Sequence, residues 1–311
     1  MESLFFRVVN ARYKEREYVY LKLLESRREE NKVKHIQLVN LSNVGHLPAD
    51  RMKPLHDALS KTLALYKVLV ESGPPWCRYL KTSYLLALEN AFKVEHRCRD
   101  QDLRDVLRQD GKRKQNSFFD EDTFTRLIKE KSQEHGDPRG FMCWLENTTC
   151  FVVDSSGLPL SLSQLGSQMG EDVVEFLLNL RIEEEVPEFF LANTCERLYN
   201  TFQLMAVLEK EKGYTVKEIF VYKQLTDWSG KPELRMEKML ICGSAAAMGD
   251  NRVNQAILSI NSLKSHISYV SERIRSITGG NPLPEQDLSC TYFTSSFFYK
   301  IFSDIKARHK I

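Results

Sequence analysis

Basic side chains concentrate in two stretches of the sequence, where they could contact phosphate groups. Lys and Arg gain affinity for a polyanion because binding releases the counterions that the phosphates hold. Acidic residues interleave the first stretch, so a solvated hairpin surface remains an open alternative. The side chains that we expect to contact nucleic acid are Arg27, Arg28, Lys32, Lys34, Lys112, Arg113 and Lys114.

The cysteines and histidines argue against several other kinds of site. The seven cysteines fall at irregular spacings and include no C-x-x-C pair, so neither a disulfide framework nor a zinc ribbon is indicated. The seven histidines include no H-x-x-x-H or H-E-x-x-H pair, so a zinc hydrolase is unsupported. The run Gly243–Gly249 lacks the lysine of a phosphate-binding loop and is interpreted as a small-residue turn.

The composition is that of a globular protein. The 311 residues are 42% hydrophobic and carry a net charge of +2, which suits packed cores and excludes extensive disorder. The sequence has no signal-peptide pattern and no apolar run long enough to span a bilayer. We therefore expect no membrane partner and a cytoplasmic location close to the nucleoid, or a nuclear one in a eukaryote.

The N-terminal residues predict a hairpin followed by helices. Two β-prone runs, 18–26 and 33–41, flank a turn-like segment and predict an antiparallel hairpin. Apolar residues then recur at spacings of three and four from Leu55 to Val70, which predicts an amphipathic helix. A second helix is expected over 80–94. The polar segment 95–116 is interpreted as a connection or an exposed helix.

Strand and helix signals alternate in the middle of the chain. Strands are expected at 118–120, within 141–153, and at 158–165, 189–192 and 217–222, with helices at 170–180 and 196–212. This order of strands and helices is that of a ribonuclease-H-like α/β sheet, in which three antiparallel strands precede helix–strand units.

The C-terminal region is expected to be helical. Apolar residues from Val253 to Ile274 recur with a mean spacing near 3.5 residues, which is compatible with a coiled-coil contact or with packing on the protein's own core. The run Gly279–Pro282 should end this helix. The aromatic-rich residues 292–311 predict a terminal docking helix with basic residues at its end.

Several motifs follow one another in an order that points to a family. Glu25–Ser26 ends the first strand of the hairpin, and Asp120 is followed closely by Thr123. Asp154–Leu160 reads Asp-Ser-Ser-Gly-Leu-Pro-Leu, and apolar residues and an alanine precede Asn193. With these motifs, residues 1–222 resemble the DDE-type insertion-sequence transposases that begin with a β-hairpin domain.

This resemblance implies a metal site with incomplete ligands. Asp120 matches the family's first catalytic aspartate, and Asn193 stands where the second is expected. Asp154 is a further candidate metal ligand, and Glu272 is a candidate for the third acid. The implied cofactor is a pair of Mg²⁺ or Mn²⁺ ions, which grouped carboxylates hold for phosphoryl transfer. An asparagine brings no charge, so such a site would be weakened.

The expected organisation follows from these elements. Residues 1–72 form a hairpin–helix DNA-binding domain, 73–117 a helical connection, 118–245 a ribonuclease-H-like core and 246–311 a helical C-terminal region. The expected function is that of a transposase-derived, catalytically degenerate protein that binds double-stranded DNA. Two alternatives stay open: an active metal-dependent transposase or nuclease, and an interaction scaffold that forms homo-oligomers through the 253–274 helix.

Overall fold

The chain divides into two compact units, which are described separately. Residues 1–127 and 263–311 form the first unit, and residues 128–262 form the second. This division groups the last helices with the N-terminal residues, whereas the sequence predicted a separate region over 246–311. The computed structural model describes residues 3–14, 16–29, 32–41, 44, 47–72, 79–94, 100–111, 141–146, 149–154, 158–164, 189–193, 215–226, 232–243, 250–281 and 283–311.

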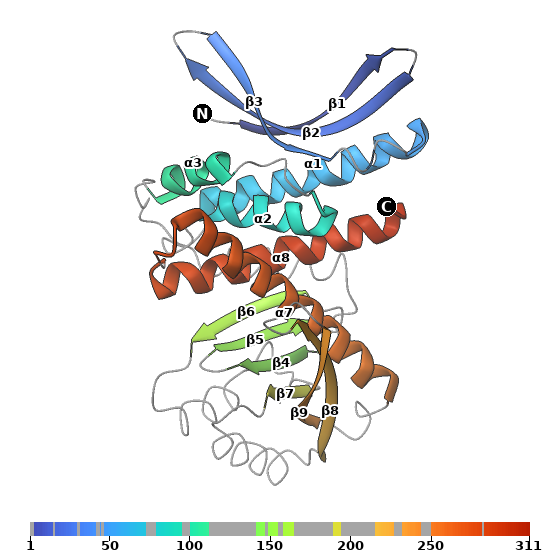
Figure 1. The fold of residues 1–311 in the computed structure, drawn as a ribbon, viewed down its shortest axis with the longest axis vertical. Coiled ribbons are helices and arrows are strands. Elements are labelled where there is room, and N and C mark those ends of the chain that lie inside the picture. The colour runs from blue at the N-terminus through green and yellow to red at the C-terminus, as the bar shows by residue number, and fades with distance from the viewer. Residues whose placement is uncertain are drawn as a thin grey trace. The chain divides into compact units, whose positions relative to one another are not determined.

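The first unit begins with a three-stranded antiparallel sheet (Figure 1). Strands β1 (Ser3–Tyr13), β2 (Arg16–Glu29) and β3 (Lys32–Asn40) pair in the order β1-β2-β3. The predicted hairpin is confirmed as β2 and β3. Strand β1 was not predicted, although its Phe, Val and Tyr residues favour a strand.

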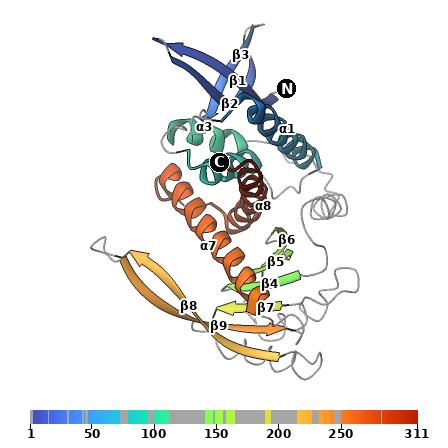
Figure 2. The same cartoon turned by 90° about the vertical axis from the view of Figure 1, so that its right-hand side faces the viewer.

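The central strand of the sheet, β2, is longer than the segment that pairs with either neighbour, and the sheet is bent along it. Residues 22–26 of β2 pair with both neighbours, whereas its first residues pair only with β1 and its last only with β3. A register shift lies between Leu23 and Leu24, and bulges of this kind bend and twist a sheet. The two hairpin ends therefore form arms that rise away from the helices (Figures 1 and 2).

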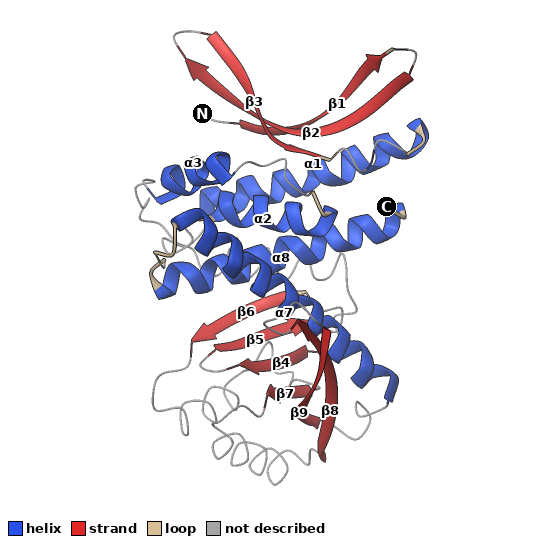
Figure 3. Cartoon of the chain, in the orientation of Figure 1, coloured by secondary structure: helices blue, strands red, loops and turns tan. Residues whose placement is uncertain are grey.

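Helices cover one side of this sheet (Figure 3). Nearest the strands are α1 (Ala49–Ser72), α2 (Leu80–Phe92) and α3 (Asp100–Gly111). Behind them lie α8 (Glu285–His309) and the part of α7 (Asp250–Thr278) that belongs to this unit. The predicted helices at 55–70, 80–94, 253–274 and 292–311 are confirmed. Helix α3 is more than an exposed connection, since Leu103, Val106 and Leu107 are buried.

The core of the first unit is built from aromatic rings. Tyr84 lies edge-on to Phe298 and Phe302, with ring centroids 4.9 and 5.2 Å away. Its buried hydroxyl is 2.7 Å from the hydroxyl of Thr62, which satisfies the polar end of the ring. These contacts hold α1, α2 and α8 together. The C-terminal helix therefore docks on the rest of the unit, as the sequence predicted.

The apolar seam of α7 packs inside its own unit where its side chains are described. Leu263, Val270 and Ile274 are buried, which is what packing on the protein's own core predicts. Helix α7 ends at Thr278, where Gly279 and Gly280 adopt positive φ angles of 66° and 88°. A side chain would be strained in that conformation, which explains why glycines end this helix.

The second unit contains a six-stranded sheet in the order β6-β5-β4-β7-β9-β8. Strands β4 (Phe141–Glu146), β5 (Thr149–Asp154) and β6 (Pro159–Gln164) form an antiparallel meander, and β7 (Phe189–Asn193) is parallel to β4. Strands β8 (Thr215–Thr226) and β9 (Pro232–Gly243) are an antiparallel hairpin whose β9 pairs with β7.

Several expectations for the predicted core, residues 118–245, are corrected or remain predictions. The β-rich stretch 141–153 falls on two strands, β4 and β5, and β9 was not predicted. The expected strand at 118–120 and the helices at 170–180 and 196–212 lie outside the described residues.

Across the described part of the chain, no helix has the length and apolar character needed to cross a membrane.

Candidate nucleic-acid interface

Strand β2 separates its charges between the two faces of the N-terminal sheet. Successive residues of a strand point to opposite faces, and directly opposite residues of an antiparallel pair share a face. The acidic positions of β2 are 17, 25 and 29, whereas Arg16, Lys22 and Arg28 stand at even positions. We call the helix-covered side the inner face and the opposite side the outer face.

The inner face holds a buried ion pair. Lys81 of α2 donates a hydrogen bond to Glu25 of β2, and the two side chains are only 2% and 0% exposed. Arg27 also donates to Glu25, at 2.9 Å, and reaches Gln109 of α3 at 3.4 Å. Burial raises the pKa of Glu25, but the hydrogen bonds and charges of Lys81 and Arg27 outweigh it and lower the pKa overall.

The outer face carries cations opposite one another. Arg7 of β1 and Lys22 of β2 are directly paired across the strands. Like charges in that position repel and destabilise a sheet, unless an anion lies nearby. Arg28 follows on the same face, and none of the outer positions in the three described strands is an Asp or Glu. The outer face therefore offers positive charge without internal compensation from carboxylates.

Aromatic rings accompany these cations. The rings of Tyr18 and Tyr20, two residues apart on β2, lie 6.3 Å apart at an interplanar angle of 18°. The ammonium of Lys22 lies 5.8 Å from the centre of the Tyr20 ring. On the same face Phe5 of β1 contacts His35 of β3 edge-on at 5.2 Å, and His35 is 3.1 Å from the hydroxyl of Ser26.

The predicted nucleic-acid residues divide between these environments. Arg28 is exposed on the outer face, whereas Lys32 and Lys34 are exposed but stand opposite Glu29 and Arg27, on the inner-face side of the sheet. Arg27 is instead engaged with Glu25 and Gln109 on the inner face, so its main role here is structural. Residues 112–114 lie outside the described part of the chain. Arg7 and Lys22 were not among the residues predicted to contact nucleic acid, although the period-two alternation of charge along β2 contained the signal that places Lys22 on this face.

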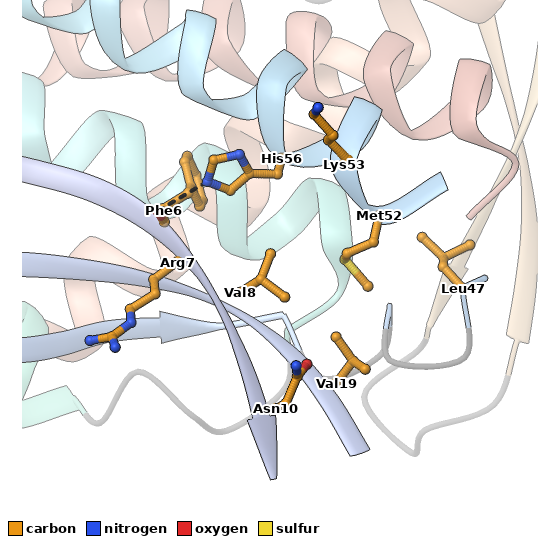
Figure 4. A pocket seen from close by; sticks show the side chains of 9 residues that line it. All are labelled: Phe6, Arg7, Val8, Asn10, Val19, Leu47, Met52, Lys53 and His56. Carbon is orange, nitrogen blue, oxygen red and sulfur yellow. Dashed lines mark hydrogen bonds between the residues drawn. The ribbon is translucent and has the colours of Figure 1, made fainter. Parts of the chain in front are cut away.

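A cavity of about 540 Å³ lies between the β1–β2 arm and the start of α1. Its described lining includes Val8, Val19 and Met52, and His56 donates from Nε2 to the carbonyl oxygen of Phe6 at 3.2 Å (Figure 4). Its cations, Arg7 and Lys53, extend away from each other at the rim (Figure 4). They do not converge on one position, so we assign no ligand to this cavity.

Strand pairing places two of the expected metal residues, Asp154 and Asn193. Asp154 pairs with Phe141 at the start of β4, whereas Ala192, next to Asn193, pairs with Leu145 near its end. Asp154 and Asn193 are therefore separated by about 16 Å along the direction of β4, at ~3.3 Å per residue. Asp120 lies outside the described residues, and Glu272 is an exposed residue of α7 in the first unit.

The register brings a different residue beside Asn193. Glu146 and Asn193 follow the paired residues Leu145 and Ala192, so they stand at the same end of two parallel neighbouring strands. Two divalent ions need grouped negative ligands, and the expected metal site stays a prediction. Among the described residues, no three His, Cys, Asp or Glu side chains form a cluster that could hold a metal ion.

Comparison with known proteins gives a match at the N-terminus. Residues 6–64 match the family model of the IS1634 family transposase N-terminal domain. This range contains β2, β3 and most of β1 and α1. No curated protein and no solved structure matches the chain. The resemblance to insertion-sequence transposases is thus confirmed: the chain is similar, through residues 6–64, to the N-terminal domain of IS1634 family transposases.

Proposed function

We propose that this transposase-related chain binds double-stranded DNA through the outer face of its N-terminal sheet. The proposal rests on the separation of charge on β2. Lys22 and Arg28 are on the outer face, and Glu25 is buried on the inner face. Cations arranged without local carboxylates attract phosphates and release their counterions. The match of residues 6–64 to a transposase domain supports the choice of DNA as the polyanion.

The arms of the sheet extend this interface. Each arm is a two-stranded ribbon, and a ribbon of this kind can enter the major groove of B-DNA. Arg12, Lys32 and Lys34 stand opposite Glu17, Glu29 and Arg27, so they share the inner face. The outer-face positions of β2 include Arg16 at its start and Arg28 near its end. The cross-strand pair of Arg7 and Lys22 lies between them. A duplex on the outer face would thus meet cations along the whole length of β2.

The test is the salt dependence of duplex binding by the full chain. The triple variant Arg7→Gln, Lys22→Gln, Arg28→Gln should lower the slope of log K against log salt by about 0.9 for each phosphate that the variant no longer neutralises. A matched control is Arg51→Gln, Lys61→Gln, Lys67→Gln, which removes the same charge from exposed positions of α1. Absence of salt-dependent binding by the parent, or an equal decrease in the control, would contradict the proposal.

We further propose that the second unit is a degenerate ribonuclease-H-like core. The meander of β4, β5 and β6 with a parallel β7 supports this fold, although β9 lies between β7 and β8. Asn193 in place of an acid, and the separation of Asp154 from it, support the loss of metal-dependent catalysis. Nicking of supercoiled DNA with Mg²⁺ or Mn²⁺ tests this: we expect none, and nicking abolished by Asp120→Ala would overturn it.

A further inference from the structure

The aromatic rings of the outer face are not explained by duplex binding. Tyr18 is 38% exposed, and Tyr20 lies beside it with its ring nearly parallel. The helices of the same unit lie on the other side of the sheet (Figures 1 and 2), so these rings do not contribute to the helix-packed core. A preference of tyrosine for strands accounts for its presence in β2. It does not account for two tyrosines on the face that carries the cations.

Paired and unpaired bases differ in what they offer such rings. Stacking within a duplex covers the faces of its bases, so a protein meets phosphates, sugars and the base edges in the grooves. Unpaired bases can expose their ring faces, which stack on aromatic side chains with little preference for sequence. Tyr18 and Tyr20 therefore suit unpaired bases better than a closed duplex.

The cations next to the rings complete a surface for a single strand. Lys22 lies over Tyr20, and Arg7 stands opposite Lys22 on β1. Single-strand-binding surfaces combine aromatic platforms with a positively charged track for the backbone. The base faces of one strand would thus meet Tyr18 and Tyr20 of β2. Its phosphates would meet Lys22 of β2 and Arg7 of β1.

We propose that Tyr18 and Tyr20 stack on unpaired bases of DNA, while Arg7 and Lys22 contact the phosphates of the same strand. This inference rests on the proposed function, because it assigns a second form of DNA to the same face. It assigns the tyrosines to unpaired nucleotides and leaves the outer cations to serve duplex and single strand alike.

The experiment compares a single-stranded oligonucleotide with the duplex of the same sequence, using fluorescence anisotropy and the full chain. Tyr18→Ala and Tyr20→Ala should each weaken single-strand binding about tenfold, in the range found for base–aromatic stacking, and should leave duplex binding within about twofold. Tyr18→Phe and Tyr20→Phe keep the ring, so both affinities should stay close to those of the parent.

Val70→Ala on α1 is the control for loss of an exposed apolar side chain, and thermal unfolding verifies that each variant folds. Equal losses for single strand and duplex, no loss for either, or Phe variants as weak as Ala variants would overturn the inference. The last result would indicate contacts of the hydroxyl groups rather than stacking. A parent that binds duplex with a normal salt slope while the tyrosine variants change nothing overturns this inference alone. A parent without salt-dependent binding overturns the proposed function.

Discussion

Arg27 and Arg28 are neighbours on β2, yet they belong to opposite faces of the N-terminal sheet. Arg27 donates to buried Glu25 and contacts Gln109, whereas Arg28 is exposed on the face without acids. The charges of Glu25 and Arg27 on the inner face are paired inside the protein, whereas the outer face carries no Asp or Glu beside its cations. A count of basic residues treats both arginines alike, and only the alternation of the strand separates a structural from a binding role.

The largest effect is expected on the inner face. Lys81→Met leaves Glu25 buried with Arg27 as its remaining basic partner, and breaking a buried ion pair on one side costs about 3–5 kcal/mol of unfolding free energy. Urea unfolding measures this loss. The matched control is Lys300→Met, which breaks a partly exposed pair with Asp304 on α8 and should cost less than about 1 kcal/mol. Similar losses for the two variants would contradict a buried, structural inner face.

The helical layer beneath the inner face should make stability depend on pH. His266 is buried between Asn90 and Ser295, with 2.8 Å between each pair of polar atoms, and burial lowers its pKa to about 3. The unfolded chain takes up a proton near pH 6.5, while the folded chain does not. Stability is therefore unaffected above that pH and falls below it, by about 2 kcal/mol at pH 5.

Denaturant unfolding between pH 8 and pH 5 measures this dependence on pH. Restricting the range to pH 5 and above keeps the titration of Glu25, whose pKa is lowered, outside the window. His266→Asn cannot take up the proton, so the drop towards pH 5 should disappear in this variant. A parent whose stability is constant from pH 8 to pH 5 would be inconsistent with a neutral buried imidazole.

A smaller effect should separate the two adjacent arginines. Arg27→Gln removes a hydrogen bond to a buried carboxylate and should cost about 1.5 kcal/mol of stability. Arg28→Gln should change stability by less than about 0.5 kcal/mol, as exposed substitutions usually do, and should instead lower the salt slope of duplex binding. Unfolding and duplex binding are measured on both variants. A stability loss in Arg28→Gln together with a lower salt slope in Arg27→Gln would refute the division of the faces.

Local patterns predicted the helices of the first unit and the β2–β3 hairpin, but not the roles of charges. The spacing of apolar residues in α1 and α8 indicates directly which side is buried, so periodicity was sufficient there. Strand β1 was missed because its short polar residues and basic end weaken the apolar alternation. The partner of Glu25 could not be predicted, because Lys81 is far away in sequence and a lysine in an apolar helix is normally exposed.

The candidate metal site shows the same limit. Asp154 and Asn193 were associated through the order of motifs, but strand pairing decides which residues meet. The register of β4 with β5 and β7 places them at opposite ends and brings Glu146 next to Asn193 instead. Neither the order nor the spacing of residues along the chain contains that register.

The most direct test of the binding face is lysine footprinting of the full chain with and without duplex DNA. An amine-reactive label followed by mass spectrometry measures the accessibility of each lysine. We expect DNA to protect Lys22 on the outer face and to leave Lys61 and Lys67 on α1 as reactive as before. Protection of Lys61 and Lys67 with Lys22 unchanged would contradict the assignment of the outer face to DNA.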